Sequence, residues 1–290
     1  MYQPRVLTIQ DISCFGKCSL TVALPIISAM GVETVILPTA VLSTHTGGFK
    51  NFTFRDLTCD VEPIVNHWKS ENIDFGGIYT GYLGSFEQLR LVGEIFDKFG
   101  GFKLVDPVMA DNGKLYAGFT PEFAAGMAKL CGKADYIVPN ITEASFMLGL
   151  DYPGICSPAS ARRYLPRLLE LGCKVAVLTG VIDGDRQGVI AYDGKDFYEY
   201  YSDNLAAKFH GTGDIWASTF CGALALRKDL PSSLKIAVDY TVSCIRRSLN
   251  DDEHKYGVRF EEAIGELTRM LDAPFDLKAD SKHKPKYKLL

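Results

Sequence analysis

Residues 210–214, His-Gly-Thr-Gly-Asp, combine two glycines, a hydroxyl and a carboxylate just before an apolar pattern with helical spacing. Gly211 and Gly213 let the backbone turn sharply and bare its N–H groups. Such groups at a helix N-terminus, with the helix dipole, suit a transferring phosphoryl group. A carboxylate repels phosphate, so we interpret Asp214 as the base that takes a proton from an attacking alcohol. The alternative is that Asp214 only stabilises its helix.

A second candidate group lies in Val-Asp-Pro-Val-Met, residues 105–109, where Asp106 ends an apolar run that is typical of a buried strand. Asp111 follows five positions later. The two carboxylates could contact Mg²⁺ directly or through water. The alternative for Asp106 is a simple Asp-Pro turn.

The segment Pro-Asn-Ile-Thr-Glu, residues 139–143, starts a predicted helix directly after a predicted strand. Asn140 and Glu143 are three residues apart and can point into one site. Thr142 could cap the helix, and the alternative interpretation of the whole segment is capping with an acid in the first turn.

The elements that must position these residues alternate along the chain. Predicted strands cover 5–11, 34–38, 76–81, 102–108, 135–139 and 174–180, with a hairpin at 188–194 and 195–201. Predicted helices cover 19–31, 61–71, 85–101, 121–130, 142–149, 158–171, 213–227, 231–249 and 259–271. Strand runs such as Val-Ala-Val-Leu-Thr-Gly are apolar on both faces, as in a parallel sheet covered by helices. We therefore predict one three-layer α/β/α domain over residues 1–290, with a mostly parallel central sheet.

In such a sheet ligands bind beyond the carboxyl ends of the strands. Polar or small residues stand at the predicted strand ends: Asp11, Thr44 to Gly48, Thr80 to Tyr82, Asp106, Asn140 with Glu143, Thr179 with Gly180, and Asp214. We expect them to meet along one rim.

The charge distribution indicates which classes of partner the protein can bind. The formal net charge is -4, but residues 278–290 hold five Lys against one Asp, which leaves 26 basic and 34 acidic residues, a charge of -8, elsewhere. A mildly acidic body argues against nucleic-acid binding. We interpret the basic tail as a solvated terminus, although it could also contact phosphate or an anionic membrane.

The eight cysteines contain no C-x-x-C pair, and no signal peptide or long apolar span is evident. We therefore expect reduced thiols in a cytoplasmic protein that does not bind membranes.

The motifs, in order, are TIQDISCFG, THTGGF, YTGYLGS, VDPVMAD, VPNITEA, VLTG and HGTGD, between about residues 5 and 250. This series resembles the pyridoxal/pyridoxamine (vitamin B6) kinases of the ribokinase-like superfamily. The resemblance implies a ribokinase-like fold and ATP-dependent phosphorylation of the 5'-hydroxymethyl group of a B6 vitamer. It also implies Mg²⁺, a homodimer and a monovalent cation such as K⁺.

The resemblance assigns roles to residues. Asp214 is similar to the catalytic base, and the backbone of Gly211, Thr212 and Gly213 to the anion hole for the γ-phosphate. The residues that correspond in this resemblance to Mg²⁺ and nucleotide contacts are Asp106, Asp111, Asn140, Glu143 and Thr179, with Asp106 and Glu143 as the metal ligands. Those that resemble the lining of the pyridine pocket are Asp11, Thr46 and Tyr82.

The sequence departs from the family pattern mainly in this pocket. Many members carry Ser where Asp11 stands and Gln where Gly47 stands, and their first loop is longer and richer in glycine than Ser-Cys-Phe-Gly-Lys-Cys-Ser. Gly180 also replaces a usual Ser. The carboxylate of Asp11 favours a cationic ligand such as pyridoxamine.

Other functions remain open. Hydroxymethylpyrimidine kinases of thiamin metabolism have a similar fold and motifs, but commonly carry Cys where Asp214 stands. A sugar kinase is disfavoured because its early Gly-Gly segment is missing from residues 10–50. From a different class, the chain could be a non-catalytic vitamer-binding protein, which the presence of Asp214, Asp106 and Glu143 disfavours.

Overall fold

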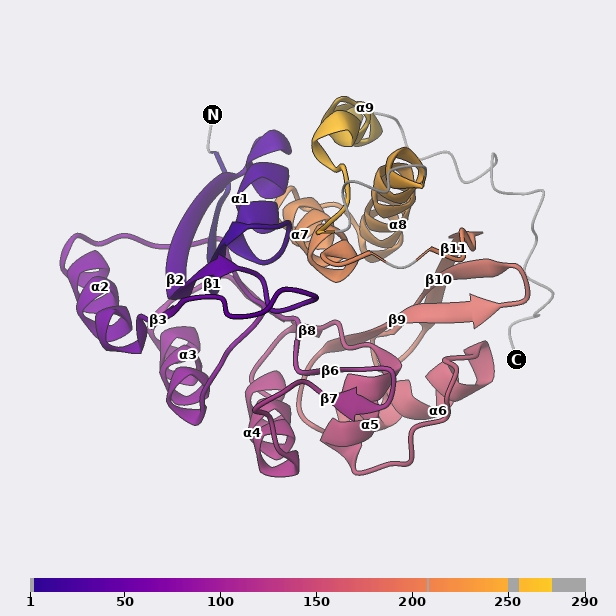
Figure 1. The fold of residues 1–290 in the computed structure, drawn as a ribbon, viewed down its shortest axis with the longest axis horizontal. Helices are drawn as coiled ribbons and strands as arrows, with labels where there is room; N and C mark the ends of the chain where they lie inside the picture. Colours follow the sequence, from indigo (N-terminus) through magenta and orange to yellow (C-terminus); the bar gives the residue numbers. More distant parts are fainter. Residues whose placement is uncertain (1–2, 208, 250–255, 273–290) are drawn as a thin grey trace.

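A nine-stranded sheet lies at the centre of the computed structural model, which describes residues 3–207, 209–249 and 256–272 (Figure 1). The strand order is β11-β10-β9-β8-β5-β4-β1-β2-β3. The pairings from β2 through β1, β4, β5 and β8 to β9 are parallel, whereas β3, β10 and β11 join antiparallel at the two edges. The predicted mostly parallel sheet is therefore confirmed.

The strands of this sheet are β1 (Arg5–Phe15), β2 (Glu33–Thr44), β3 (Phe54–Asp56), β4 (Gly77–Thr80), β5 (Phe102–Val105), β8 (Tyr136–Ile137), β9 (Val175–Asp183), β10 (Arg186–Tyr192) and β11 (Phe197–Asp203). A separate hairpin pairs β6 (Ala110–Asp111) with β7 (Lys114–Leu115). The helices are α1 (Leu20–Ala29), α2 (Thr58–Ser70), α3 (Phe86–Lys98), α4 (Pro121–Cys131), α5 (Ile141–Leu148), α6 (Pro158–Leu169), α7 (Thr212–Ala225), α8 (Leu230–Ser248) and α9 (Ile264–Asp272), the last preceded by a 3₁₀ turn at Glu261–Ala263.

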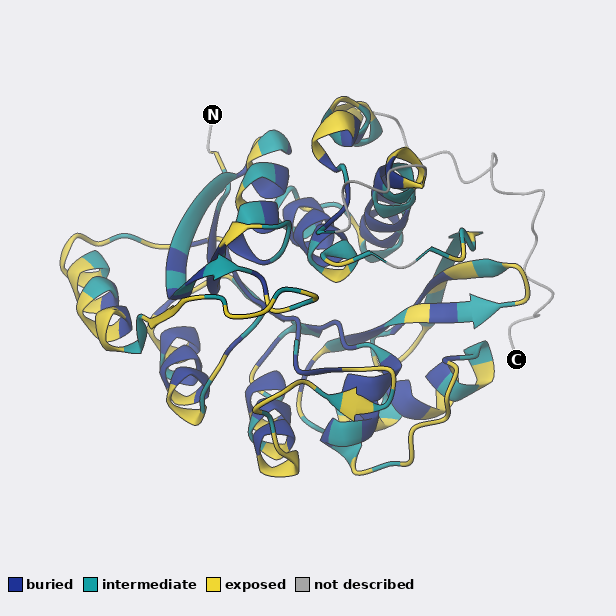
Figure 2. Ribbon diagram, viewed as in Figure 1, coloured by how far each residue is buried: buried dark blue, intermediate teal, exposed yellow. Residues whose placement is uncertain are grey.

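Helices cover both faces of the sheet. Helices α1, α7 and α8 lie on one face and α2 to α6 on the other, with α9 outside α8 (Figure 1). Successive side chains of β1 point to opposite faces, so Val6 belongs to the apolar cluster under α7 while Leu7 belongs to the cluster under α3 and α4. This double burial explains why the strand sequences are apolar without alternation (Figure 2).

Helix α7 is the element that carries the glycine-rich turn. Its residues from Ile215 to Ala223 are all buried, packed against the sheet and against α1 and α8. A helix buried around most of its circumference needs an apolar sequence on all sides. Its first turn lies at the carboxyl ends of the parallel strands, next to the loop between β1 and α1, where a ligand can reach it.

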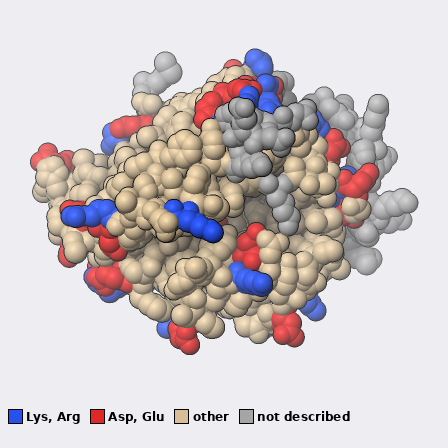
Figure 3. Space-filling model, in the orientation of Figure 1, with Lys and Arg blue, Asp and Glu red and all other residues tan. Residues whose placement is uncertain are grey.

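Three short strands were not expected from the sequence: β3, β6 and β7. The helix expected over 259–271 is regular only from Ile264, because the preceding residues form a 3₁₀ turn. The basic tail at 278–290 lies outside the described residues. On the face drawn in Figure 3, Lys and Arg side chains are scattered singly among Asp and Glu. None of the helices that the structure describes is long and apolar enough to cross a membrane.

Candidate active site

The turn that begins α7 places its two glycines in opposite surroundings. Gly211 is the N-cap and has φ 81°, in the left-handed region that favours glycine. A Cβ atom built there would lie 1.9 Å from the carbonyl oxygen of Lys17. A Cβ atom on Gly213 would meet no atom within 4 Å. Gly211 therefore allows the turn to pack against the loop before α1, while the side of Gly213 is open for a ligand to approach.

Asp214 lies in the first turn of α7 and is half-buried. The backbone N–H of Ser19 donates a hydrogen bond to its carboxylate, which favours the charged form. Burial and the nearby carboxylate of Asp11 act more strongly in the other direction and raise the pKa of Asp214 to about 7. A base with a pKa near neutrality is well suited to accept a proton from an alcohol.

Asp106 directly follows β5 and is 7% exposed. Within the described part of the chain its carboxylate accepts no hydrogen bond, and burial followed by the charge of Asp214 raises its pKa well above the usual range. A bare buried carboxylate beside a second one is a position that a cation would stabilise.

The donor set around Asp106 thus fits Mg²⁺, whose ligands are oxygens, when water and nucleotide phosphates complete the shell. The chain alone does not supply a full set: among the residues with described positions, no group of three or more His, Cys, Asp or Glu could hold a metal ion.

Asn140 and Glu143 form a capping box at the start of α5. Asn140 Oδ1 accepts from the N–H groups of Thr142 at 2.8 Å and Glu143 at 2.9 Å, while Glu143 Oε2 accepts from Asn140 N–H at 2.8 Å. Glu143 Oε1 also accepts from Met109 N–H at 3.3 Å. The alternative interpretation, capping with an acid in the first turn, is therefore confirmed. The capping box also holds Glu143 close to Asp106. Burial raises the pKa of Glu143 most, and the charge of Asp106 raises it further.

The expected cap at Thr142 is wrong. Asn140 has the extended backbone of an N-cap, whereas Thr142 lies inside the helix and accepts a hydrogen bond from Gly113 N–H at 3.1 Å. This bond connects α5 to the β6–β7 hairpin.

The other two predicted nucleotide-side residues lie next to Asn140. Asp111 is exposed on the β6–β7 hairpin, and Asn140 Nδ2 donates to the carbonyl oxygen of the preceding Ala110 at 2.9 Å. Thr179 forms a parallel bridge with Asn140. The structure therefore brings Asp106, Asp111, Asn140, Glu143 and Thr179 together. On the face drawn in Figure 3, the surface is hollowed above this hairpin.

On the substrate side, Asp11 is 5% exposed and lies inside β1, four residues before its end, rather than at the end of the strand as expected. The register between β1 and β2 shifts between Gln10 and Ile12. Irregularities of this kind often redirect side chains next to active sites. Tyr82, after β4, is close enough to Asp11 that this carboxylate, after burial, raises its pKa. Thr46 is exposed, two residues after β2.

His45, next to Thr46, fixes the loop after β2. Its Nδ1 accepts from Gly47 N–H at 3.1 Å, so its Nε2 carries the proton and donates to the carbonyl oxygen of Tyr256 at 2.9 Å. Burial is the main cause that lowers the pKa of His45, which keeps the ring neutral. The ring lies 5.2 Å from that of His210, just before the glycine-rich turn. The loop and the turn are therefore in contact.

Sequence reasoning did not assign Cys18 and Ser19 to the site, although both face it. The Sγ atom of Cys18 would lie 3.9 Å from a Cβ on Gly211, and burial with the charges of Asp214 and Asp11 raises its pKa. Ser19 contacts the carboxylates of both Asp11 and Asp214. The available signal was the position of Ser19 before an apolar helix, which indicates an N-cap but not a long-range partner. The cysteines are free thiols, as expected.

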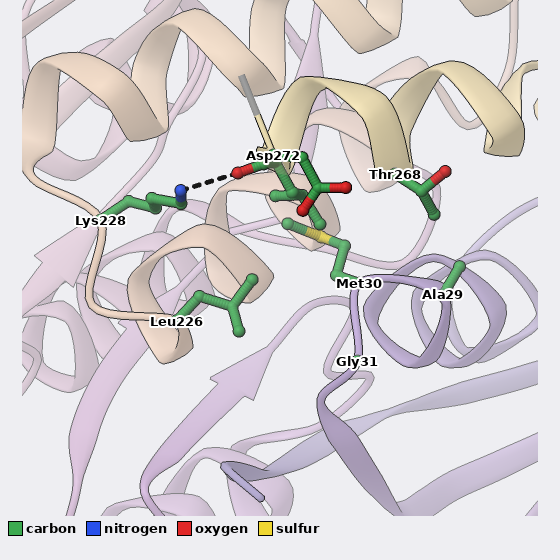
Figure 4. Close-up of a pocket in the computed structure, with 8 residues that line it drawn as sticks. Ala29, Met30, Gly31, Leu226, Lys228, Thr268 and Asp272 are labelled. Atoms are coloured by element: carbon green, nitrogen blue, oxygen red, sulfur yellow. Dashed lines mark hydrogen bonds between the residues drawn. The ribbon is translucent and has the colours of Figure 1, made fainter. Parts of the chain in front are cut away.

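A cavity of about 450 Å³ lies elsewhere, between the C-terminal ends of α1 and α7 and helix α9 (Figure 4). Lys228 Nζ donates to the carbonyl oxygen of Leu271 at 2.9 Å at its edge. Leu226, which lines it, stands twelve residues after Asp214 along α7, about 18 Å away at 1.5 Å per residue. This cavity contains none of the predicted site residues.

Comparisons with known proteins agree with this arrangement. The family of phosphomethylpyrimidine kinases matches residues 23–259. A crystal structure from Bacteroides thetaiotaomicron, assigned to phosphomethylpyrimidine kinase, is similar with a TM-score of 0.89 and 33% identity, covering 96% of each chain. An orthorhombic form from the same organism was crystallised with pyridoxal.

Pyridoxal kinases are similar as well. The Lactobacillus plantarum enzyme has a TM-score of 0.87 and 28% identity, covering 93% of this chain and 98% of its own. The Dictyostelium discoideum enzyme is 26% identical over 271 residues, 86% of each chain. The chain therefore belongs to the phosphomethylpyrimidine kinase family and is a kinase with the ribokinase-like fold of the pyridoxal kinases.

Proposed function

We propose that this protein transfers the γ-phosphoryl group of ATP to the 5'-hydroxymethyl group of a vitamin B6 vitamer. One observation carries the proposal: a carboxylate with a pKa raised to about 7 stands in the first turn of α7, beside a glycine whose outer side is open. The relatives that bind or phosphorylate pyridoxal support the choice of acceptor.

Asp214 takes the proton of the 5'-hydroxyl group while the oxygen of that hydroxyl group attacks the γ-phosphorus. The bond from that phosphorus to the bridging oxygen of ADP breaks, and ADP leaves with the electron pair. The main-chain N–H groups of Gly211, Thr212 and Gly213 face the phosphoryl oxygens, where donors fixed in advance stabilise the charge that develops.

We assign the metal site to Asp106, with Glu143 behind it. When bound there, Mg²⁺ would neutralise charge on the phosphates. Glu143 uses each of its oxygens to accept one backbone N–H, so it orients the segment around Met109 and retains lone pairs for water. The nucleotide is assigned to Asn140, Thr179 and Asp111. Dependence on K⁺ and the homodimer stay predictions.

The proposal is tested by coupled ADP release over pyridoxal, pyridoxine, pyridoxamine and hydroxymethylpyrimidine. We expect turnover with at least one B6 vitamer. Asp214→Asn should reduce it roughly 10²–10⁴-fold while ATP binding persists, because only the proton acceptor is lost.

Three other outcomes of these assays would reject all or part of the proposal. Turnover with hydroxymethylpyrimidine alone would replace the proposal by the thiamin-pathway kinase. Vitamer binding without ADP release would indicate a binding protein. Near-normal turnover in Asp214→Asn would reject the role of the base.

A further inference from the structure

The carboxylate of Asp11 is buried without a positive charge to balance it. Its Oδ2 accepts from Ser13 Oγ at 3.0 Å, and the hydroxyl of Ser19 is a second donor. Both donors are neutral. No Lys or Arg among the described residues forms an ion pair with Asp11, whereas Glu33 on the neighbouring strand β2 pairs with Arg5 at 2.8 Å.

The titratable groups that face Asp11 do not supply the missing charge. They are His45, Tyr82, Cys18 and Asp214. His45 is neutral because its two ring nitrogens are fixed as one acceptor and one donor. Tyr82 and Cys18 are neutral acids, and Asp214 adds negative charge. An isolated buried carboxylate is strongly disfavoured unless a proton or a cation accompanies it.

The position of Asp11 indicates where that proton or cation comes from. Asp11 lies on β1, beside Tyr82 after β4, on the substrate side of the site. The carboxylate of Asp214 lies near that of Asp11, because Ser19 contacts both, Asp11 through its hydroxyl group and Asp214 through its backbone N–H. An acceptor molecule whose hydroxyl group meets Asp214 can thus present a second group to Asp11.

Resting on the proposed function, we propose that Asp11 selects substrates that present a positively charged N–H donor, so that the carboxylate and the ligand share one proton in the complex. In a B6 vitamer the donor is either the protonated ring nitrogen, common to all vitamers, or the ammonium group of pyridoxamine. A carboxylate paired with such a donor forms a short, charge-assisted hydrogen bond.

The test compares Asp11→Asn with wild type by calorimetric binding of pyridoxamine, pyridoxine and pyridoxal without ATP. The variant keeps the size of the side chain but cannot balance a cation. We expect the dissociation constant of at least pyridoxamine to rise about 30-fold or more. Weakening of all three vitamers identifies the ring nitrogen as the donor, and weakening of pyridoxamine alone identifies the ammonium group.

A second readout excludes a merely structural effect. If the carboxylate and the ligand share one proton, the number of protons taken up or released on binding at one pH should differ between wild type and Asp11→Asn, which cannot hold that proton. Titration in two buffers of different ionisation enthalpy measures this. The melting temperature of the variant should not fall, since an unbalanced buried charge has been removed.

Asp60→Asn is the matched control, because Asp60 is exposed on α2 and remote from the site; it should bind as wild type does. Equal affinity of Asp11→Asn and wild type for all three vitamers, or equal proton uptake, would overturn the proposal. Wild-type ADP release separates the two claims: if it persists, only the role of Asp11 is wrong, whereas its absence rejects the proposed function itself.

Discussion

The two sides of the turn that begins α7 differ in how much of the site the protein fills itself. On the side of Gly211, the turn packs directly against the backbone of Lys17, and the loops after β1 and β2 are joined through His45 and Tyr256. On the side of Gly213, the space is open, and the carboxylate of Asp106 accepts no hydrogen bond from the described residues. One side is built by packing, and the other is left for phosphate and metal.

The difference shows that one residue of the motif serves the fold and another serves catalysis. Glycine is required at position 211 by the backbone, and at position 213 by the ligand that we propose. The same substitution at the two positions should therefore give opposite results for stability and activity.

Gly211→Ala should give the larger effect on the fold. A methyl group there would lie 1.9 Å from a backbone oxygen, and the residue has φ 81°. We expect a loss of about 3 kcal/mol in the free energy of unfolding, from backbone strain and displacement of the loop before α1. Urea denaturation measures this. Wild-type stability in this variant would show that the packed side is not rigid.

Gly213→Ala should leave the fold intact and impair catalysis. The added methyl group meets no protein atom, and alanine in a helix is favoured over glycine by up to about 1 kcal/mol. It would occupy the path of the phosphoryl group, so we expect turnover to fall roughly tenfold to a hundredfold. Steady-state ADP release and denaturation on the same preparation check both halves. Full activity would mean that the phosphate does not approach this side.

The contrast also explains what the sequence could predict. The long helices and the apolar parallel strands follow from periodicity, and residues that follow strands, such as Asp106 and Asn140, could be assigned to one rim from topology alone. Thr179 was expected near a strand end but lies inside β9, four residues before its end. Strands β3, β6 and β7 have two or three residues, too few to show a period. The contact of Ser19 with Asp214 joins residues far apart in the chain, so no local pattern indicates it.

Asp214→Asn should stabilise the protein, because a carboxylate on the open side is retained for catalysis at a cost to stability. The pKa of Asp214 is about 7 in the folded protein, above the value near 3.9 expected when unfolded. The folded state therefore binds more protons between these values, and stability falls as pH rises through this window.

Because asparagine does not titrate, the variant should exceed wild type by about 1–2 kcal/mol at a pH near 8, a figure reduced for the half-buried position, and by little at a pH near 4. Denaturation at both pH values measures the difference. A variant that is less stable than wild type at the higher pH would contradict the raised pKa.

The central claim is that Asp214 accepts the proton of the attacking hydroxyl group, and the pH dependence of kcat/KM tests it most directly. Wild-type kcat/KM for a B6 vitamer should fall on the acidic side with an apparent pKa near 7, because the protonated carboxyl group cannot act as a base. The residual activity of Asp214→Asn should lack this acidic limb. An identical limb in both proteins would contradict the claim and assign the proton to another group.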